Sequence, residues 1–162
     1  MSDEEAIQEI DEDTCRKLLG RRHFGRVGVV DDEGPVIFPV NYVLDGDDIV
    51  FRTDPGIKQS AAAGGRAACF EIDDVDTGRR FGWNVLARGR LDEVVDDDER
   101  ERLRRILPRP FPGGRKAHVV RLSCTVLSGR RIPLPEDAAE EGHGSPKLGN
   151  LWEGQDGSDL LG

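Results

Sequence analysis

Hydrophobic and polar residues alternate along the middle of the chain, which is typical of β-strands with one buried face. Between Val36 and Leu44 every second residue is apolar or aromatic, and the other face includes Pro39 and Asn41. Asp-Gly-Asp follows at 45–47, and these residue types favour a tight turn because they tolerate positive φ. The pattern therefore predicts a β-hairpin whose second strand begins just after this turn.

The rest of the chain shows this strand periodicity in several places and a helical periodicity in others. Strand-like alternation recurs at 25–30, 49–53, 67–73, 81–94 and 117–127. Helical spacing behind acidic caps, or behind the turn at 54–56, predicts helices at 11–19, 57–63 and 96–107. Several short strands with peripheral helices predict a mainly β fold with α additions, built as a six-stranded β-barrel.

A chain of 162 residues has the size of one domain with one core. Residues 1–9 are acidic and lack a core pattern, so we expect a disordered N-terminus. The barrel domain is expected at 10–134. Residues 135–162 form an acidic, Gly-rich tail with few core-forming residues, which we also expect to be disordered.

The formal net charge of −9 comes from the two ends of the chain. Residues 1–13 and residues 136–162 carry seven acids each. The two segments together contain only one base, Lys147. The remaining residues carry 18 acids and 22 bases, which gives a mildly basic domain. This charge suits a small anionic ligand. It does not predict nucleic-acid binding, because the bases are interleaved with acids and aromatic residues are few.

Several function classes lack support in the sequence. No apolar run approaches the length of a membrane helix and no signal peptide precedes the acidic start, so we expect a cytoplasmic protein. Three scattered cysteines predict neither a disulfide framework nor a metal site. No histidine lies in a nucleophile motif, and no catalytic residue can be assigned from the sequence.

One predicted strand end carries residues suited to a phosphate. Arg52 and Thr53 end the strand at 49–53, and Lys58 follows across the turn. The start of the predicted helix at 57–63 would add unpaired backbone N–H groups and the positive end of its dipole. A guanidinium, a hydroxyl, an ammonium and a helix N-terminus together suit a phosphate monoester. The alternative is a surface loop with two solvated cations.

Five short motifs occur in the order of a known family, namely PVNY at 39–42, FRT at 51–53, GIK at 56–58, FEID at 70–73 and GWNV at 82–85. Over about 10–134 the chain resembles the flavin-binding split-barrel proteins related to pyridoxamine 5′-phosphate oxidase. It is most similar to the small bacterial branch that includes the nitroimidazole-resistance proteins. The resemblance implies a six-stranded, FMN-binding split barrel that forms a homodimer with the flavin between the subunits.

The resemblance also implies which residues bind the cofactor. Arg52 and Lys58 would hold the flavin phosphate, and Trp83 and Asn84 would line the flavin ring. The family more often has serine at the position of Asn84, and Trp83 could instead be a core residue. The residues expected at the cofactor are Pro39, Val40, Asn41, Tyr42, Phe51, Arg52, Thr53, Lys58, Trp83, Asn84 and Val85.

The leading functional hypothesis is an FMN-binding protein that acts as a small flavin-dependent oxidoreductase on a small-molecule substrate. In such a protein the cofactor carries the chemistry and the chain positions it. One alternative is a protein that stores or sequesters FAD or FMN and catalyses nothing. Another is a reductase that uses the deazaflavin coenzyme, whose phosphate could bind at the same residues. The sequence does not name the substrate.

Overall fold

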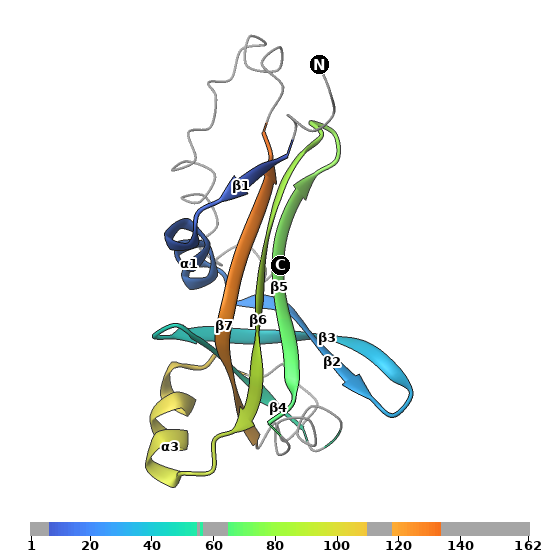
Figure 1. The fold of residues 1–162 in the computed structure, drawn as a ribbon. Helices are drawn as coiled ribbons and strands as arrows, with labels where there is room; N and C mark the ends of the chain where they lie inside the picture. The colour runs from blue at the N-terminus through green and yellow to red at the C-terminus, as the bar shows by residue number, and fades with distance from the viewer. Residues whose placement is uncertain (1–6, 55, 57–64, 110–117, 134–162) are drawn as a thin grey trace, which may run out of the picture.

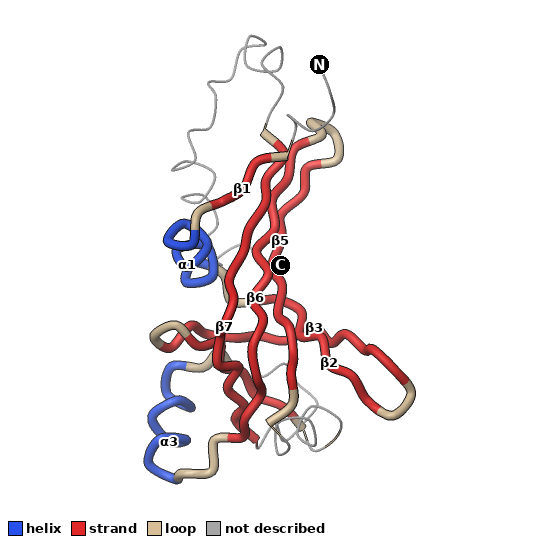
Figure 2. The backbone as a smooth tube through the Cα atoms, in the orientation of Figure 1, coloured by secondary structure: helices blue, strands red, loops and turns tan. Residues whose placement is uncertain are grey.

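The structure is a computed structural model that describes residues 7–54, 56, 65–109 and 118–133. Strands dominate this part of the chain, with two helices beside them (Figures 1 and 2). The elements are β1 (Gln8–Ile10), α1 (Glu12–Arg21), β2 (Phe24–Asp31), β3 (Gly34–Asp45), β4 (Asp48–Thr53), β5 (Ala67–Asp76), β6 (Phe81–Glu93), α3 (Asp97–Ile106) and β7 (His118–Ile132). The predicted helix at 57–63 lies outside the described residues.

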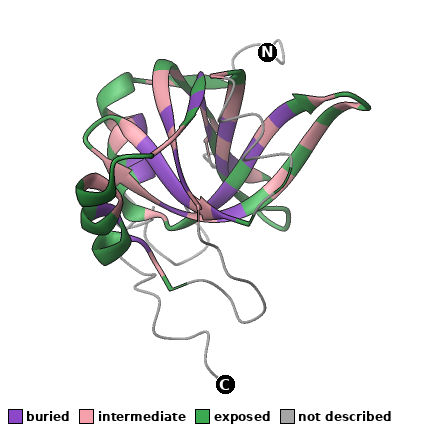
Figure 3. Cartoon of the chain, turned by 90° about the horizontal axis from the view of Figure 1, so that it is seen from below, coloured by how far each residue is buried: buried purple, intermediate pink, exposed green. Residues whose placement is uncertain are grey.

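Six strands close into an antiparallel ring. The order is β7–β4–β3–β2–β5–β6, and β6 pairs back with β7. Strand β1 is added to the outside of the ring through β7. Seen along the ring, buried residues gather on its inner side and exposed residues on its outer side (Figure 3). The predicted six-stranded barrel with α additions is confirmed.

The alternation in β3 has the predicted effect on burial. Val40 and Tyr42 are buried, while Val36, Phe38 and Leu44 are partly buried and pack against the same core. Burial of apolar side chains such as these contributes roughly 25 cal/mol per Å² of apolar surface to folding. The ring is therefore filled with side chains on the face that the sequence pattern selects.

Helix α1 is attached to the ring by its apolar face and by one hydrogen bond. Its buried side chains are Cys15, Leu18 and Leu19. Asp11 caps the helix by accepting a hydrogen bond from the backbone N–H of Thr14 at 2.8 Å. At the other end of the helix the Tyr42 hydroxyl donates to the carbonyl oxygen of Leu19 at 2.7 Å. This buried bond links the centre of the barrel to the helix.

Replacing Tyr42 with phenylalanine should lower the free energy of unfolding by about 1 kcal/mol, because the buried Leu19 carbonyl loses its donor. The edge-to-face contact between residue 42 and Phe70 is kept in this variant. Urea denaturation should show a lower midpoint and an unchanged m-value. Tyr42→Leu, which also removes the ring contact, should cost more. Equal stability of Tyr42→Phe and the parent protein would contradict this role of the hydroxyl.

A β-bulge changes which face of β7 is buried. Unbroken alternation over the predicted strand at 117–127 would put Val126 on the same face as Val120, Leu122 and Cys124. In the structure Gly89 pairs with Cys124 and Arg88 with Val126, so Thr125 is an extra residue and the alternation shifts by one. Val126 is consequently 54% exposed. Gly89 is required at this point, because a Cβ there would lie 1.9 Å from the carbonyl oxygen of Ser123.

Other differences from the prediction concern ends and edges. Strand β1 includes Gln8 and Glu9, which had been assigned to the disordered N-terminus; pairing with β7 orders them. Strand β5 continues to Asp76 and β7 to Ile132, because the two pair with β6 along its length. Helical spacing would put Ile106 next to Leu103 on the apolar side of α3, but Ile106 is 48% exposed.

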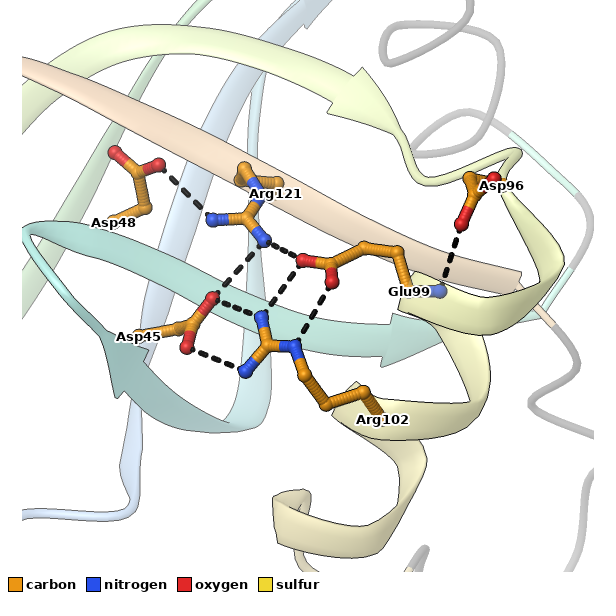
Figure 4. Close-up of polar contacts among 6 residues, drawn as sticks. All are labelled: Asp45, Asp48, Asp96, Glu99, Arg102 and Arg121. Carbon is orange, nitrogen blue, oxygen red and sulfur yellow. Dashed lines mark hydrogen bonds and ion pairs between the residues drawn. The ribbon is translucent and has the colours of Figure 1, made fainter.

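Helix α3 packs on the outside of the ring near β4 and β7. Leu103 and Leu107 form a second, smaller cluster with Val50 and Val119. A charged cluster, defined as Asp45, Asp48, Glu99, Arg102 and Arg121, continues this contact. Figure 4 shows it bridging the β3–β4 turn, α3 and β7.

No helix in the described ranges is long and apolar enough to cross a membrane.

Candidate functional site

Arg52 lies near the end of β4, on the side of the strand that faces α3. Val50, two residues earlier, is in the small apolar cluster under that helix. One terminal nitrogen of Arg52, Nη2, donates to the carbonyl oxygen of Arg104 in the last turn of α3 at 2.7 Å. Its Nε is buried and has no hydrogen-bond partner among the described residues. The guanidinium is thus held in place by one bond and keeps unused donors.

The charge of Arg52 is poorly compensated by the protein. Burial lowers the pKa of this guanidinium, and the positive charge of Arg104 lowers it further. Arginine nevertheless stays protonated, because a guanidinium is too weak an acid to lose its proton in a protein. Within the described ranges no carboxylate pairs with Arg52. A partly buried cation whose buried Nε–H has no partner among the described residues favours an anionic ligand, and a phosphate fits this donor set.

Thr53, the predicted site residue next to Arg52, is on the opposite face of β4. Thr53 is 1% exposed and its hydroxyl donates to the backbone oxygen of Asp54 at 3.1 Å. Across the ladder it pairs with His118, whose Nδ1 lies 2.6 Å from a carboxylate oxygen of Glu93. Thr53 therefore belongs to the inner face of the ring, whereas Arg52 is on the side of β4 that faces the helix. Lys58, the other predicted phosphate ligand, lies outside the described residues.

The predicted site residues of β3 and β4 divide between the two faces of the sheet. Pro39 is exposed and Asn41 is partly exposed on the outer face. Val40, Tyr42 and Phe51 are buried in the core. Direct cofactor contact therefore remains a prediction for all of them. It is geometrically simplest for Pro39 and Asn41, which reach the outside of the ring.

The GWNV segment of β6 divides in the same way. Trp83 and Val85 are buried, and the guanidinium carbon of Arg22 lies 5.5 Å from the centre of the Trp83 ring. This geometry is a cation–π contact. Asn84, between them, is exposed on the outer face. Of this segment, only Asn84 presents its side chain to the outer face.

Asn84 lines a pocket of about 400 Å³ between β1, β6 and β7. Polar and apolar side chains from all three strands form its wall. The lining residues are Glu9, Ile10, Asn84, Leu86, Arg88, Leu127, Ser128, Gly129 and Arg130. Apart from Asn84, none of these was predicted as a site residue. The outward alternation of Asn84, Leu86 and Arg88 along β6 is the sequence signal that could have indicated them.

The pocket and Arg52 lie at opposite ends of the same long strands. Arg52 pairs with Val119 and Asn84 pairs with Arg130, and both partners belong to β7. At about 3.3 Å per residue, these positions of β7 are roughly 35 Å apart. Figure 1 shows β7 running from the α3 end of the molecule to β1. Within one chain, the structure does not bring Arg52 and Asn84 together.

The described strands form a closed antiparallel ring, and a partly buried arginine without a carboxylate partner among the described residues lies at the end of β4. These features define a barrel protein with a corner suited to an anion. Comparison with known proteins names the family. The family model for pyridoxamine 5′-phosphate oxidase matches residues 11–131. The chain belongs to the pyridoxamine 5′-phosphate oxidase family, as the five sequence motifs predicted.

Individual relatives agree with this assignment. An uncharacterised protein of Mycobacterium tuberculosis is 31% identical over 131 residues, covering 78% of this chain and 86% of its own. The solved structure of the FAD binding protein from Mycobacterium smegmatis is 31% identical, with a TM-score of 0.63, covering 77% of this chain and 98% of its own. A candidate 5-nitroimidazole antibiotic resistance protein from Bacteroides thetaiotaomicron, at 15% identity, TM-score 0.59 and coverage of 77% and 88%, shares the fold.

Proposed function

We propose that this protein binds a flavin nucleotide, with FMN as the leading candidate, and that Arg52 binds the phosphate. The observation that carries the proposal is the buried Arg52 Nε, which has no partner among the described residues, in a guanidinium without a carboxylate beside it. A phosphate would accept from these donors and compensate the charge. The relative from Mycobacterium smegmatis, described as an FAD binding protein, supports a flavin as the ligand.

The proposed active form is a homodimer. If Arg52 binds the phosphate and Asn84 lies at the flavin ring, the two residues cannot contact one FMN within a single chain, because roughly 35 Å of β7 separates their partners. Two copies can satisfy both contacts when the Asn84 face of one chain lies beside the Arg52 corner of the other. This arrangement also explains why the predicted site residues lie at both ends of the barrel.

The proposed activity is that of a small, cytoplasmic flavin-dependent oxidoreductase acting on a small molecule. A bound flavin would supply the hydride transfer. The chain's own contribution is to hold the phosphate through Arg52, to fix that side chain through the Arg104 carbonyl, and to present Asn84 on the outer face. The second candidate is a protein that stores FAD or FMN without turnover; the Mycobacterium smegmatis relative, an FAD binding protein, supports FAD as a candidate ligand but does not distinguish storage from turnover.

Mass spectrometry of the small molecules released from purified protein tests this proposal. We expect FMN, at about one molecule per chain. Release of FAD instead of FMN would favour the storage hypothesis. Release of the deazaflavin coenzyme would favour the deazaflavin-dependent reductase over both flavin hypotheses. Addition of a reduced nicotinamide or a nitro compound to the loaded protein then separates an enzyme from a store. Absence of any flavin, both as purified and after incubation with FMN or FAD, would contradict the proposed function.

Mixed dimers test the two-chain site. Arg52→Ala and Asn84→Trp should each lower flavin binding when expressed alone. When the two variants are co-expressed, a dimer that contains one of each keeps one site with both native residues. We therefore expect flavin binding to recover in the mixed dimers, up to one site in two. If each site were built within one chain, both sites of a mixed dimer would carry a defect and titration would show no recovery.

A further inference from the structure

The pocket between β1, β6 and β7 contains two arginines without an acidic partner. Neither Arg88 nor Arg130 takes part in an ion pair within the described part of the chain. Two arginines elsewhere on the barrel surface show the contrast: Arg26 lies 3.2 Å from Glu71 and 3.0 Å from Asp73, and Arg22 lies 2.8 Å from Asp74. The pocket also contains one acid, Glu9. Its side chains thus carry a net positive charge.

The strand register brings these arginines to the same wall. On β6 the outward positions Asn84, Leu86 and Arg88 follow one another. Ser128 pairs with Leu86 and Arg130 pairs with Asn84 across the ladder to β7. The wall therefore has guanidinium groups diagonally across an apolar side chain, with an amide and a hydroxyl beside them. Such a mixture suits a ligand with one anionic group and an apolar body.

We infer that this pocket binds the anionic group of the second reactant, a small organic carboxylate or a molecule of similar charge, with Arg88 and Arg130 as its ligands. The inference rests on the proposed function in one respect, which is that Asn84 at the edge of the pocket lies beside the flavin ring. The pocket volume of about 400 Å³ is within the size range of small-molecule sites. Arg52 is not part of this pocket and keeps its separate role toward the flavin phosphate.

The experiment uses 2-naphthoate as the probe and the neutral 2-naphthamide as its uncharged counterpart. Calorimetric titration of the full chain should show naphthoate binding that weakens roughly 3- to 10-fold in Arg88→Gln and in Arg130→Gln. Naphthamide should bind weakly and equally to all three proteins. Arg90→Gln is the matched control, because Arg90 is exposed on the next outward position of β6 and does not line the pocket. It should bind naphthoate like the parent protein.

A spectroscopic measurement tests the position of the pocket relative to the flavin. In flavin-loaded protein, naphthoate should shift the visible absorption of the flavin, and Arg88→Gln and Arg130→Gln should need 3- to 10-fold more probe for the same shift. Flavin affinity itself should stay unchanged in both variants. Naphthoate binding that is insensitive to both arginines, or that flavin abolishes by competition, would overturn the inference. So would tight binding without any effect on the flavin spectrum.

Failure of the proposed function has a different signature. A protein that takes up no flavin would refute flavin binding, and would refute the role of the pocket toward a second reactant with it. Arginine-dependent naphthoate binding can still be measured in flavin-free protein, because calorimetry does not use the cofactor. Conversely, a protein that binds flavin through Arg52 while Arg88→Gln and Arg130→Gln bind naphthoate normally would refute the pocket alone.

Discussion

Replacing Arg52 with alanine should weaken FMN binding roughly 10- to 150-fold and leave riboflavin binding unchanged. The estimate follows from about 1.5–3 kcal/mol for a hydrogen bond to a charged group, at 1.4 kcal/mol per tenfold change in affinity. Riboflavin lacks the phosphate, so it reports on every other part of the site. Fluorescence titration of both flavins against the parent and variant proteins measures the difference directly.

Two further variants separate a lost phosphate contact from general damage. Arg52→Lys should recover only part of the FMN affinity, because a compact ammonium cannot reproduce the planar donor set or the bond to the Arg104 carbonyl. Arg105→Ala removes an exposed arginine from the same turn of α3 as Arg104. It should change the affinity for neither FMN nor riboflavin. Equal losses for FMN and riboflavin in Arg52→Ala would show disturbance of the barrel. Unchanged FMN affinity would remove Arg52 from the site.

The ring itself was predictable because most of its strands obey period-two alternation against a single core. Val40, Tyr42, Phe70 and Ile72 occupy the inner positions that the pattern selects. The alternation breaks at the bulge opposite Gly89, where β7 has one residue more than β6 between paired positions. A glycine marks that place in the sequence, but period two alone cannot show which residue of the facing strand is extra.

The candidate site was predictable in its chemistry and less so in its geometry. Arg52 was singled out by residue type, and the structure adds the reason for its importance, which is partial burial without a carboxylate. Short motifs, in contrast, do not distinguish inner from outer residues. They therefore grouped the buried Trp83 with the exposed Asn84. Arg88 and Arg130 were missed because their proximity depends on the β6–β7 register, which includes the bulge.

The position of Arg52 also depends on α3, since a carbonyl of that helix holds its guanidinium. The charged cluster in Figure 4 fixes the helix against the ring. Arg121 bridges three carboxylates of this cluster, because it lies 3.0 Å from Asp45, 3.1 Å from Asp48 and 2.7 Å from Glu99. Its side chain is only 21% exposed, so water replaces these contacts poorly when they are lost.

Arg121→Gln should therefore lower the free energy of unfolding by about 2 kcal/mol at pH 7, less than for a fully buried pair because solvent screens part of the interaction. For a chain of this length the midpoint of thermal unfolding should fall by roughly 4–8 °C. FMN affinity should fall modestly, since α3 holds Arg52 less firmly. Arg100→Gln is the matched control, because Arg100 pairs only with Asp97 among the described residues and is not part of the charged cluster.

The pH dependence of this loss identifies its cause. Hydrogen bonds from Arg102, and then from Arg121, lower the pKa of Asp45 despite its partial burial. The pKa of Glu99 is also lowered, first by its hydrogen bond from Arg102. Carboxylates with a lowered folded-state pKa contribute stability above their unfolded pKa, near 4, and lose it as the pH falls through the folded value. The stability difference between parent and Arg121→Gln should thus be full at pH 7 and shrink below about pH 4. A difference that stays constant down to pH 3 would assign the loss to packing of the arginine stem.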